Sequence, residues 1–197
     1  MNYDIKASLK RTKADRFDHG LGRSSDDRLL FVQDIADVGG PIMLDTCAVL
    51  DGLRGKAPAK LKDLLEVRQV YHSSVVLSEL ARPFGHLDPK HSGTKSALAP
   101  IRNILDAVKS YRVIDADANL LTEASIRVGI VARHLGLPIE DRGRLFNDAI
   151  IAAQAASHGV LLITANKRDF DLLAQLDPRL TVAFYAVAQA GTATAAH

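Results

Sequence analysis

The stretch PIMLDTCAVL, residues 41–50, places a single carboxylate, Asp45, directly after a short apolar run. The arrangement returns near the C-terminus, where residues 160–170 read VLLITANKRDF and Asp169 follows a second apolar run. Short apolar runs of this kind are typical of buried strands in a parallel sheet. Such sheets bind ligands and ions at the carboxyl ends of their strands. The two stretches therefore predict an α/β fold with an acidic site at one edge of its sheet.

Strand-like and helix-like segments alternate along the chain between these two stretches and beyond. The short apolar runs that predict strands lie at residues 42–44, 69–72, 112–114, 160–163 and 181–185. Helical spacing of apolar residues, with capping residues and Gly or Pro stops, predicts helices at residues 58–67, 74–81, 94–110, 117–135, 147–158 and 169–176. Interleaved strands and helices indicate parallel pairing, so we expect a five-stranded, mostly parallel sheet.

The two ends of the chain have a different character. Residues 1–24 are polar and basic with no sustained apolar period, so we expect a mobile arm. Residues 25–38 begin with a capping serine and have helical spacing, which predicts a helix. The expected organisation is an arm and preface helix at 1–40, one α/β domain at 41–185, and a flexible tail at 186–197.

Composition limits the class of protein. With 47% hydrophobic and 24% charged residues, the chain resembles ordinary globular proteins, and no apolar run approaches the roughly 20 residues needed to span a bilayer. The N-terminus lacks the apolar core of a secretory signal and a single cysteine cannot form an internal disulfide, so we expect a cytoplasmic protein. No phosphate-binding glycine motif follows a predicted strand, which argues against Rossmann and P-loop enzymes.

Four acids belong to one edge of the predicted sheet. Asp45 ends the first strand, Glu79 lies on the helix after the second, Asp148 falls in the first turn of the helix predicted at 147–158, and Asp169 follows the fourth strand. Two like charges ~4 Å apart cost about 4 kcal/mol at an effective dielectric constant near 20. Oxygen ligands without nearby Cys or His favour Mg²⁺ or Mn²⁺ as the compensating charge. Such a site supports phosphodiester hydrolysis.

Ordered pieces of the sequence resemble the PIN-domain ribonucleases, and within them the VapC-type toxins of bacterial toxin–antitoxin pairs. The pieces are LDT at 44–46 with VL at 49–50, SSVVLSELAR at 73–82, NDAIIAA at 147–153 and LITANKRDF at 162–170. The resemblance covers about residues 41–185. It implies a three-layer α/β/α sandwich with a five-stranded parallel sheet, Mg²⁺- or Mn²⁺-dependent cleavage of RNA, homodimerisation, and inhibition by a small antitoxin protein.

Carried over residue by residue, the resemblance implies roles for the polar residues of these pieces. The metal-binding acids would be Asp45, Glu79 and Asp148, with Asp169 in the more variable fourth position. Hydroxyls that hold the first carboxylate or a water on the ion would be Thr46 and Thr164. Asn166 would lie at the lip of the site, and Asn147 would cap its helix and steady Asp148.

Basic residues flank the expected acidic crevice, where they could contact the RNA backbone or be ordinary solvated charges. They are Arg142, Arg144, Lys167 and Arg168.

Each acid also has a purely structural interpretation. Asp45 and Asp169 could cap the helices that follow them, and Asp148 would be favourable in a first turn without any function. Glu79 could pair with Arg82 at the next turn of its helix.

Two rival functions remain beside the nuclease. A non-catalytic module of PIN shape would bind RNA or a partner protein without a metal. A haloacid-dehalogenase-like phosphatase would use Asp45 as nucleophile, but its motif has a second Asp two residues on, where Cys47 stands. No sequence feature supplies the base that a catalytic thiol needs, so Cys47 is expected to serve packing.

Overall fold

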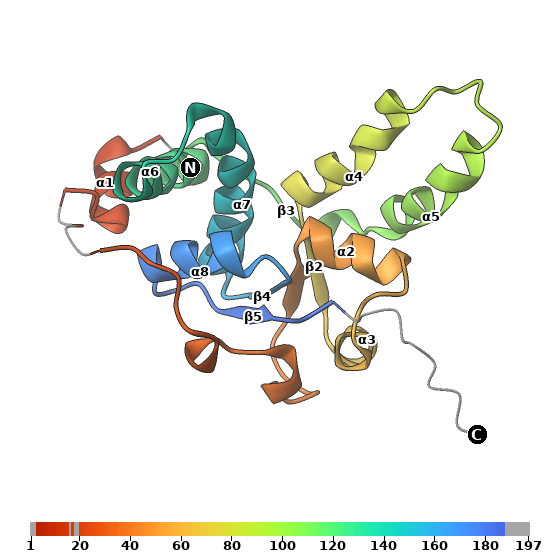
Figure 1. The fold of residues 1–197 in the computed structure, drawn as a ribbon, viewed down its shortest axis with the longest axis horizontal. Helices are drawn as coiled ribbons and strands as arrows, with labels where there is room; N and C mark the ends of the chain where they lie inside the picture. Colours follow the sequence, from red (N-terminus) through yellow and green to blue (C-terminus); the bar gives the residue numbers. More distant parts are fainter. Residues whose placement is uncertain (1–2, 16, 18–19, 188–197) are drawn as a thin grey trace.

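The computed structural model describes residues 3–15, 17 and 20–187 (Figure 1). Within these residues, five short strands form one parallel sheet in the order β3-β2-β1-β4-β5. The strands are β1 (Ile42–Leu44), β2 (Val70–Ser73), β3 (Val113–Ile114), β4 (Leu161–Thr164) and β5 (Val182–Phe184). The predicted α/β class with a five-stranded parallel sheet is confirmed.

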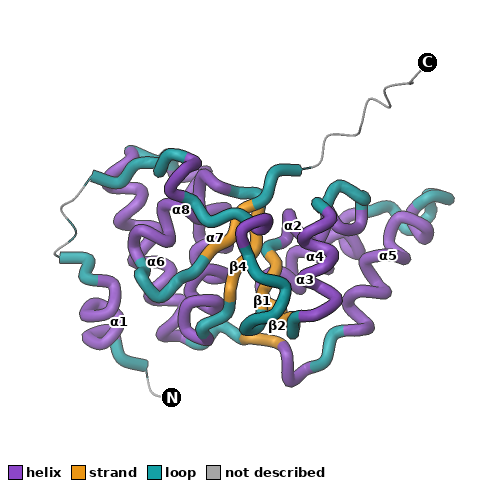
Figure 2. The backbone as a smooth tube through the Cα atoms, turned by 90° about the horizontal axis from the view of Figure 1, so that it is seen from below, coloured by secondary structure: helices purple, strands orange, loops and turns teal. Residues whose placement is uncertain are grey.

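Helices flank the sheet on both sides. Between β1 and β3 the chain forms α2 (Thr46–Leu53), α3 (Ala59–Val67), α4 (Ser74–His86) and α5 (Thr94–Ala107). The helices after β3 are α6 (Ala118–Leu135), α7 (Ile139–His158) and α8 (Lys167–Leu176). Figures 1 and 2 both show α6, α7 and α8 on one side of the strands and α2 to α5 on the other.

The core follows the alternation of side chains along the strands. Met43 and Leu162 belong to the larger buried cluster, which includes residues of α6, α7 and α8. Their neighbours Ile42 and Ile163 belong to a second buried cluster with residues of α3. Because successive strand residues point to opposite faces, the strand residues of the two clusters lie on opposite faces of the sheet. The result is the expected three-layer α/β/α sandwich.

The expectation of a mobile N-terminal arm is wrong for residues 5–12. These residues form α1 (Ile5–Thr12), whose first turn is capped by the Asp4 side chain. The backbone N–H of Asp4 donates to Asn119 Oδ1 at 2.8 Å, and Arg11 pairs with Glu123 at 2.5 Å. These contacts with α6 stabilise a helix too short to be stable alone. Part of the predicted arm, residues 1–2, 16, 18 and 19, lies outside the described residues.

The preface helix predicted at residues 25–38 is also wrong. This segment contains two single 3₁₀ turns, Asp26–Arg28 and Val32–Asp34. Between them the chain is extended along the edge of the sheet, where the backbone N–H of Phe184 donates to the carbonyl of Leu30 at 2.8 Å. Phe31 forms a parallel bridge with Phe184. Pairing with the sheet edge thus replaces the continuous helix that the apolar spacing predicted.

Three further boundaries differ from expectation. The helix predicted to stop before Pro83 continues to His86, where Arg102 of α5 lies over the Phe84 ring at 5.0 Å. Residues 46–53, for which no element was predicted, form α2. Most of the predicted tail, from residue 188 on, lies outside the described residues, and the division at residues 40 and 185 stays a prediction. In the part of the chain that the structure describes, no helix has the length and apolarity needed to cross a membrane.

Candidate active site

The carboxyl ends of β1 and β4 begin the site. Asp45 follows β1 and caps α2. Its buried carboxylate accepts hydrogen bonds from three groups, on Thr46, Thr164 and Cys47. The backbone N–H of Thr46 donates to Oδ1 at 2.7 Å, and the Thr164 hydroxyl at the end of β4 donates to Oδ2 at 2.9 Å. Burial raises the pKa of Asp45, and the charge of Glu79 adds to this, while the donated hydrogen bonds oppose it. Thr164 therefore holds the first carboxylate, as predicted.

Glu79 of α4 faces the same edge. Its Oε1 accepts a hydrogen bond from Asn147 Nδ2 at 2.7 Å, and its Oε2 accepts one from the Thr46 hydroxyl. Thr46 thus links two acids, with its backbone on Asp45 and its side chain on Glu79. These partners come from α2 and α7, so Glu79 points into the site and its described partners do not include Arg82.

Asp148 and Asp169 complete the group through a shared amide. Asn166 Nδ2 donates to Asp148 Oδ2 at 3.1 Å and to Asp169 Oδ2 at 3.0 Å. Burial raises the pKa of Asp148 to about 8, with further contributions from the charges of Asp45, Asp169 and Glu79. The structure therefore gathers all four predicted acids at one edge, although their roles stay predictions.

The predicted role of Asn147 as a helix cap is wrong. α7 begins at Ile139, so Asn147 and Asp148 lie inside the helix, and the Asn147 amide holds Glu79 instead. Pro138 at the N-cap, with Glu140 and Asp141 in the first turn, gives α7 an earlier start. A different asparagine, Asn166, is the N-cap of α8. Its Oδ1 accepts a hydrogen bond from the backbone N–H of Asp169 at 3.3 Å.

Cys47 contacts Asp45, which the sequence did not reveal. Its Sγ donates to Asp45 Oδ2 at 2.9 Å and lies 3.4 Å from Thr164 Oγ1. Burial and the neighbouring charge of Asp45 raise the pKa of the thiol to about 12. Cys47 is thus a protonated donor to Asp45 and no nucleophile. The signal was its place two residues after a helix-capping Asp, which brings its side chain back to the cap.

Of the four basic residues predicted to contact RNA, two lie beside Asp169 and two do not. Arg144 pairs with Asp169 at 3.3 Å and Arg168 approaches it at 3.9 Å, and both side chains are largely exposed. Arg142 instead donates to the carbonyl of Leu137 at 3.1 and 3.3 Å. Lys167 turns away to Asp26 at 2.7 Å. Only the first pair lies against the acidic group.

The donor chemistry of the site fits a hard divalent cation, because the four acids offer oxygen ligands. The raised pKa of Asp148 indicates negative charge that such an ion would neutralise. Among residues 3–15, 17 and 20–187, no three Asp, Glu, His or Cys side chains are arranged so that they could hold an ion together.

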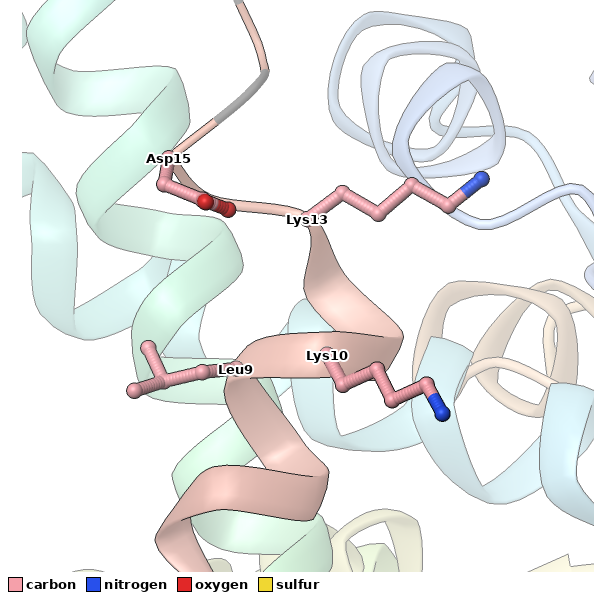
Figure 3. Close-up of a pocket in the computed structure, with 4 residues that line it drawn as sticks. All are labelled: Leu9, Lys10, Lys13 and Asp15. Atoms are coloured by element: carbon pink, nitrogen blue, oxygen red, sulfur yellow. The ribbon is translucent and has the colours of Figure 1, made fainter.

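Two hollows lie apart from the acids. One of about 520 Å³ is lined by Leu9, Lys10, Lys13 and Asp15 at the end of α1. Figure 3 shows the two lysines pointing the same way and Leu9 pointing toward the opposite side. The other is an apolar groove of about 410 Å³ between α2, α3, α4 and α5. Its apolar lining includes Val49, Leu53, Leu61, Leu65, Val76, Leu80 and Ile104.

Comparison with known proteins identifies the family. Residues 42–176, more than half of the chain, match the PIN domain. The chain belongs to the PIN domain family, whose members are typically nucleases. No curated protein matches its sequence.

Solved structures agree on the fold. VapBC from Salmonella typhimurium, bound to DNA, is 21% identical with a TM-score of 0.51, covering 75% of this chain and 100% of that one. VapBC-5 from Mycobacterium tuberculosis, a member of the VapBC family of toxin–antitoxin systems, is 20% identical with a TM-score of 0.50 and covers the same shares. FitAcB from Neisseria gonorrhoeae is 19% identical with a TM-score of 0.52, covering 72% and 96%. At these identities the likeness establishes the fold.

Proposed function

We propose that this PIN-domain protein is a metal-dependent endoribonuclease that acts in the cytoplasm. The observation that carries the proposal is the burial of Asp148 among three other carboxylates, which raises its pKa to about 8. Acidic side chains that are buried close together repel one another and lower the stability of the fold. Such clusters are therefore found mainly at functional sites. Membership of a family of nucleases supports the same conclusion.

In the proposed reaction, a water attacks an RNA phosphate in line and leaves a 3′-hydroxyl and a 5′-phosphate. Asp45 and Asp148, with support from Glu79 and Asp169, would hold Mg²⁺ or Mn²⁺, which would supply neutralising charge for the phosphate and the leaving oxygen. The Thr164, Cys47 and Thr46 donors fix Asp45. Arg144 and Arg168 are the exposed cations placed to contact RNA phosphates.

Labelled RNA incubated with the protein and Mn²⁺ tests this function. Cleavage should be abolished by a chelator and by Asp45→Asn, while Asp63→Asn, the same change on an exposed acid of α3, should cleave like the wild type. Products with a 2′,3′-cyclic phosphate would show that the ribose hydroxyl, and not water, attacked. Absence of cleavage by the wild type in both Mg²⁺ and Mn²⁺ would overturn the proposal.

One observation favours the non-catalytic module as a second candidate. Each of the four acids already accepts an internal hydrogen bond, and in the described residues no three of them form a group that could hold an ion. A protein of this kind would bind RNA in the presence of a chelator and would not cut it. The same assay therefore separates the two functions.

We further infer that the protein is the toxin of a toxin–antitoxin pair. The apolar groove between α2 and α5 supports this, because its rim exposes Leu53 and Leu65 to solvent, and an apolar segment of a small antitoxin would cover them. The similar structures named above support it as well. Co-expression with the product of a small upstream open reading frame should yield a complex, and Leu53→Asp with Leu65→Asp should break it.

The resemblance to VapC-type toxins also leads us to propose a homodimer. Light scattering of the purified protein should give about twice the chain mass of 21.3 kDa. A single-chain mass at micromolar concentration would contradict the dimer without affecting the nuclease proposal.

A further inference from the structure

Residues 20–31, here called the N-terminal strap, run along α8 and bind it. The backbone N–H of Ser24 donates to Asp171 Oδ2 at 2.6 Å, and its hydroxyl donates to Asp171 Oδ1 at 2.9 Å. Lys167 pairs with Asp26 at 2.7 Å, and its ammonium lies 4.8 Å from the centre of the Phe31 ring. The strap thus contacts α8 at its first residue and again one turn further along, and its Gly22 carbonyl accepts a hydrogen bond from Gln175 one turn beyond that at 2.9 Å.

These contacts bracket the part of α8 that belongs to the acidic site. Asp169 lies between Lys167 and Asp171 in the sequence, and Asn166 directly precedes the helix. The Asn166 amide is the donor shared by Asp148 and Asp169. A shift of this turn of α8 would therefore move both Asp169 and the amide that holds Asp148.

The contact between the strap and α8 at Asp171 is buried and hydrogen-bonded. Asp171 is buried, with 4% of its surface exposed, and in the described part of the chain Ser24 supplies the hydrogen bonds to both of its carboxylate oxygens. A buried carboxylate without these donors would be strongly disfavoured, so the contact is hard to open. The strap is itself fixed to the sheet edge through Leu30 and Phe184. It lies outside residues 42–176, which match the PIN domain.

We propose that Ser24 and Asp26 are positioning residues: by fixing the first turn of α8, they set the placement of Asn166 and Asp169 at the acidic edge. The catalytic consequence rests on the proposed nuclease function. The placement of α8 does not, because it can be measured without RNA. The same contacts account for Lys167, whose ammonium binds the strap rather than facing the acids.

The test compares the double variant Ser24→Ala/Asp26→Ala with Asp27→Ala in the full chain. Asp27 is an exposed acid in the same 3₁₀ turn, and the structure describes no hydrogen bond or ion pair for it, so its removal changes the charge without touching α8. Backbone hydrogen exchange at residues 167–171 is the first measurement. We expect exchange there to be about five-fold faster in the double variant, with wild-type rates in Asp27→Ala and unchanged rates in β1 of both.

RNA cleavage in Mn²⁺ is the second measurement. In the double variant kcat should fall about three- to ten-fold with a smaller change in KM, because Arg144 lies on α7 and is not moved with the first turn of α8. Ser24→Thr/Asp26→Glu, which keeps the donors and the charge, should restore kcat. Wild-type exchange at residues 167–171 in the double variant would overturn the proposal, as would faster exchange with an unchanged kcat. If the wild type cleaves no RNA, the nuclease proposal fails, and the exchange rates still decide whether the strap holds α8.

Discussion

Asp148 has electrostatic surroundings that oppose folding when its carboxylate is ionised. Burial and the charges of Asp45, Asp169 and Glu79 raise its pKa to about 8, whereas an unfolded Asp titrates near pH ~4. The folded state then binds the extra proton between these values, so stability falls as pH rises from about 4 to about 8. With a chelator present, Asp148→Asn should therefore raise the free energy of unfolding by about 1–3 kcal/mol at pH 8 and by little at pH 4. Urea unfolding at both pH values measures this, and an equal effect at both would contradict it.

Cys47 gives a second prediction at the scale of one residue. Its thiol pKa is raised to about 12 because it is buried beside the charge of Asp45. Only the thiolate is alkylated, so in the folded protein at pH 8 iodoacetamide should react with Cys47 roughly 10³-fold more slowly than in urea-unfolded protein, where the pKa is about 8.5. Mass spectrometry of the labelled chain measures both rates. Rapid labelling of the folded protein would show that the thiol does not donate to Asp45.

The sequence indicated the four acids at one edge and Thr46, Thr164 and Asn166 near them, but it did not reveal the contacts of Asn147 and Cys47. Asp45 and Asp169 follow apolar strands, and the topology of a parallel sheet brings such positions to one edge. Asn147 and Cys47 were misjudged because their contacts depend on how far a helix extends and which way it turns. Asn147 reaches Glu79 across 68 positions of sequence, and no local pattern encodes that pairing.

At the scale of elements, α7 shows where local patterns fail. Residues 139–146, IEDRGRLF, contain a glycine and few apolar positions, so the helix was predicted to begin only at residue 147. The structure starts it at Ile139. Strands were predicted well because each is a short apolar run that the sheet buries, whereas the ends of helices depend on tertiary contacts and caps.

Gln154 fixes α7 to the strands and provides a prediction for this element. Its side chain is fully buried, accepting from Ser73 Oγ at 2.5 Å and donating to the carbonyl of Ile114 at 2.6 Å. Gln154→Met keeps the volume but leaves the Ser73 hydroxyl without this acceptor and the Ile114 carbonyl without this donor, so we expect a loss of about 2 kcal/mol in the free energy of unfolding. Gln175→Met, which removes an exposed amide of α8, should cost less than about 0.5 kcal/mol. Equal losses in the two variants would contradict this role for Gln154.

At the scale of the whole molecule, the segment before β1 is part of the folded body. Figure 2 shows α1 beside α6, and Asp4 contacts Asn119 across 115 positions of sequence. Further along, Asp37 pairs with Lys60 of α3 at 2.6 Å. In this segment, residues 1–24 were expected to be a mobile arm because they lack an apolar period, and residues 25–38 were expected to form a helix. The segment is attached by hydrogen bonds and ion pairs to distant residues and by apolar side chains, among them Leu21 and Val32, that pack into the two buried clusters. These isolated contacts leave no periodic signal.

A buried ionic cluster joins α6 to the turn before β5 and makes stability depend on pH. Arg127 of α6 pairs with the buried Asp177 at 2.7 Å, and Arg179 donates to both oxygens of the same carboxylate. Burial opposes ionisation, but the hydrogen bonds from Arg179 and the charges of both arginines outweigh it and lower the pKa of Asp177. Asp177→Asn removes the nearer of two counterions from the buried Arg127, which keeps only Glu123 at 3.5 Å, so we expect a loss of about 3 kcal/mol at pH 7.

The sign of the pH dependence follows from the lowered pKa of Asp177. Stability from its ionised form is fully present above the unfolded value near pH ~4 and is lost as pH falls through the lower folded value. The difference between wild type and Asp177→Asn should therefore stay constant from pH 7 to about pH 5 and shrink below pH ~4. Urea unfolding across this range measures it, with Asp63→Asn as the exposed control. A difference that persists undiminished at pH 3 would mean that the Asp177 carboxylate does not compensate Arg127, and that packing alone joins α6 to this turn.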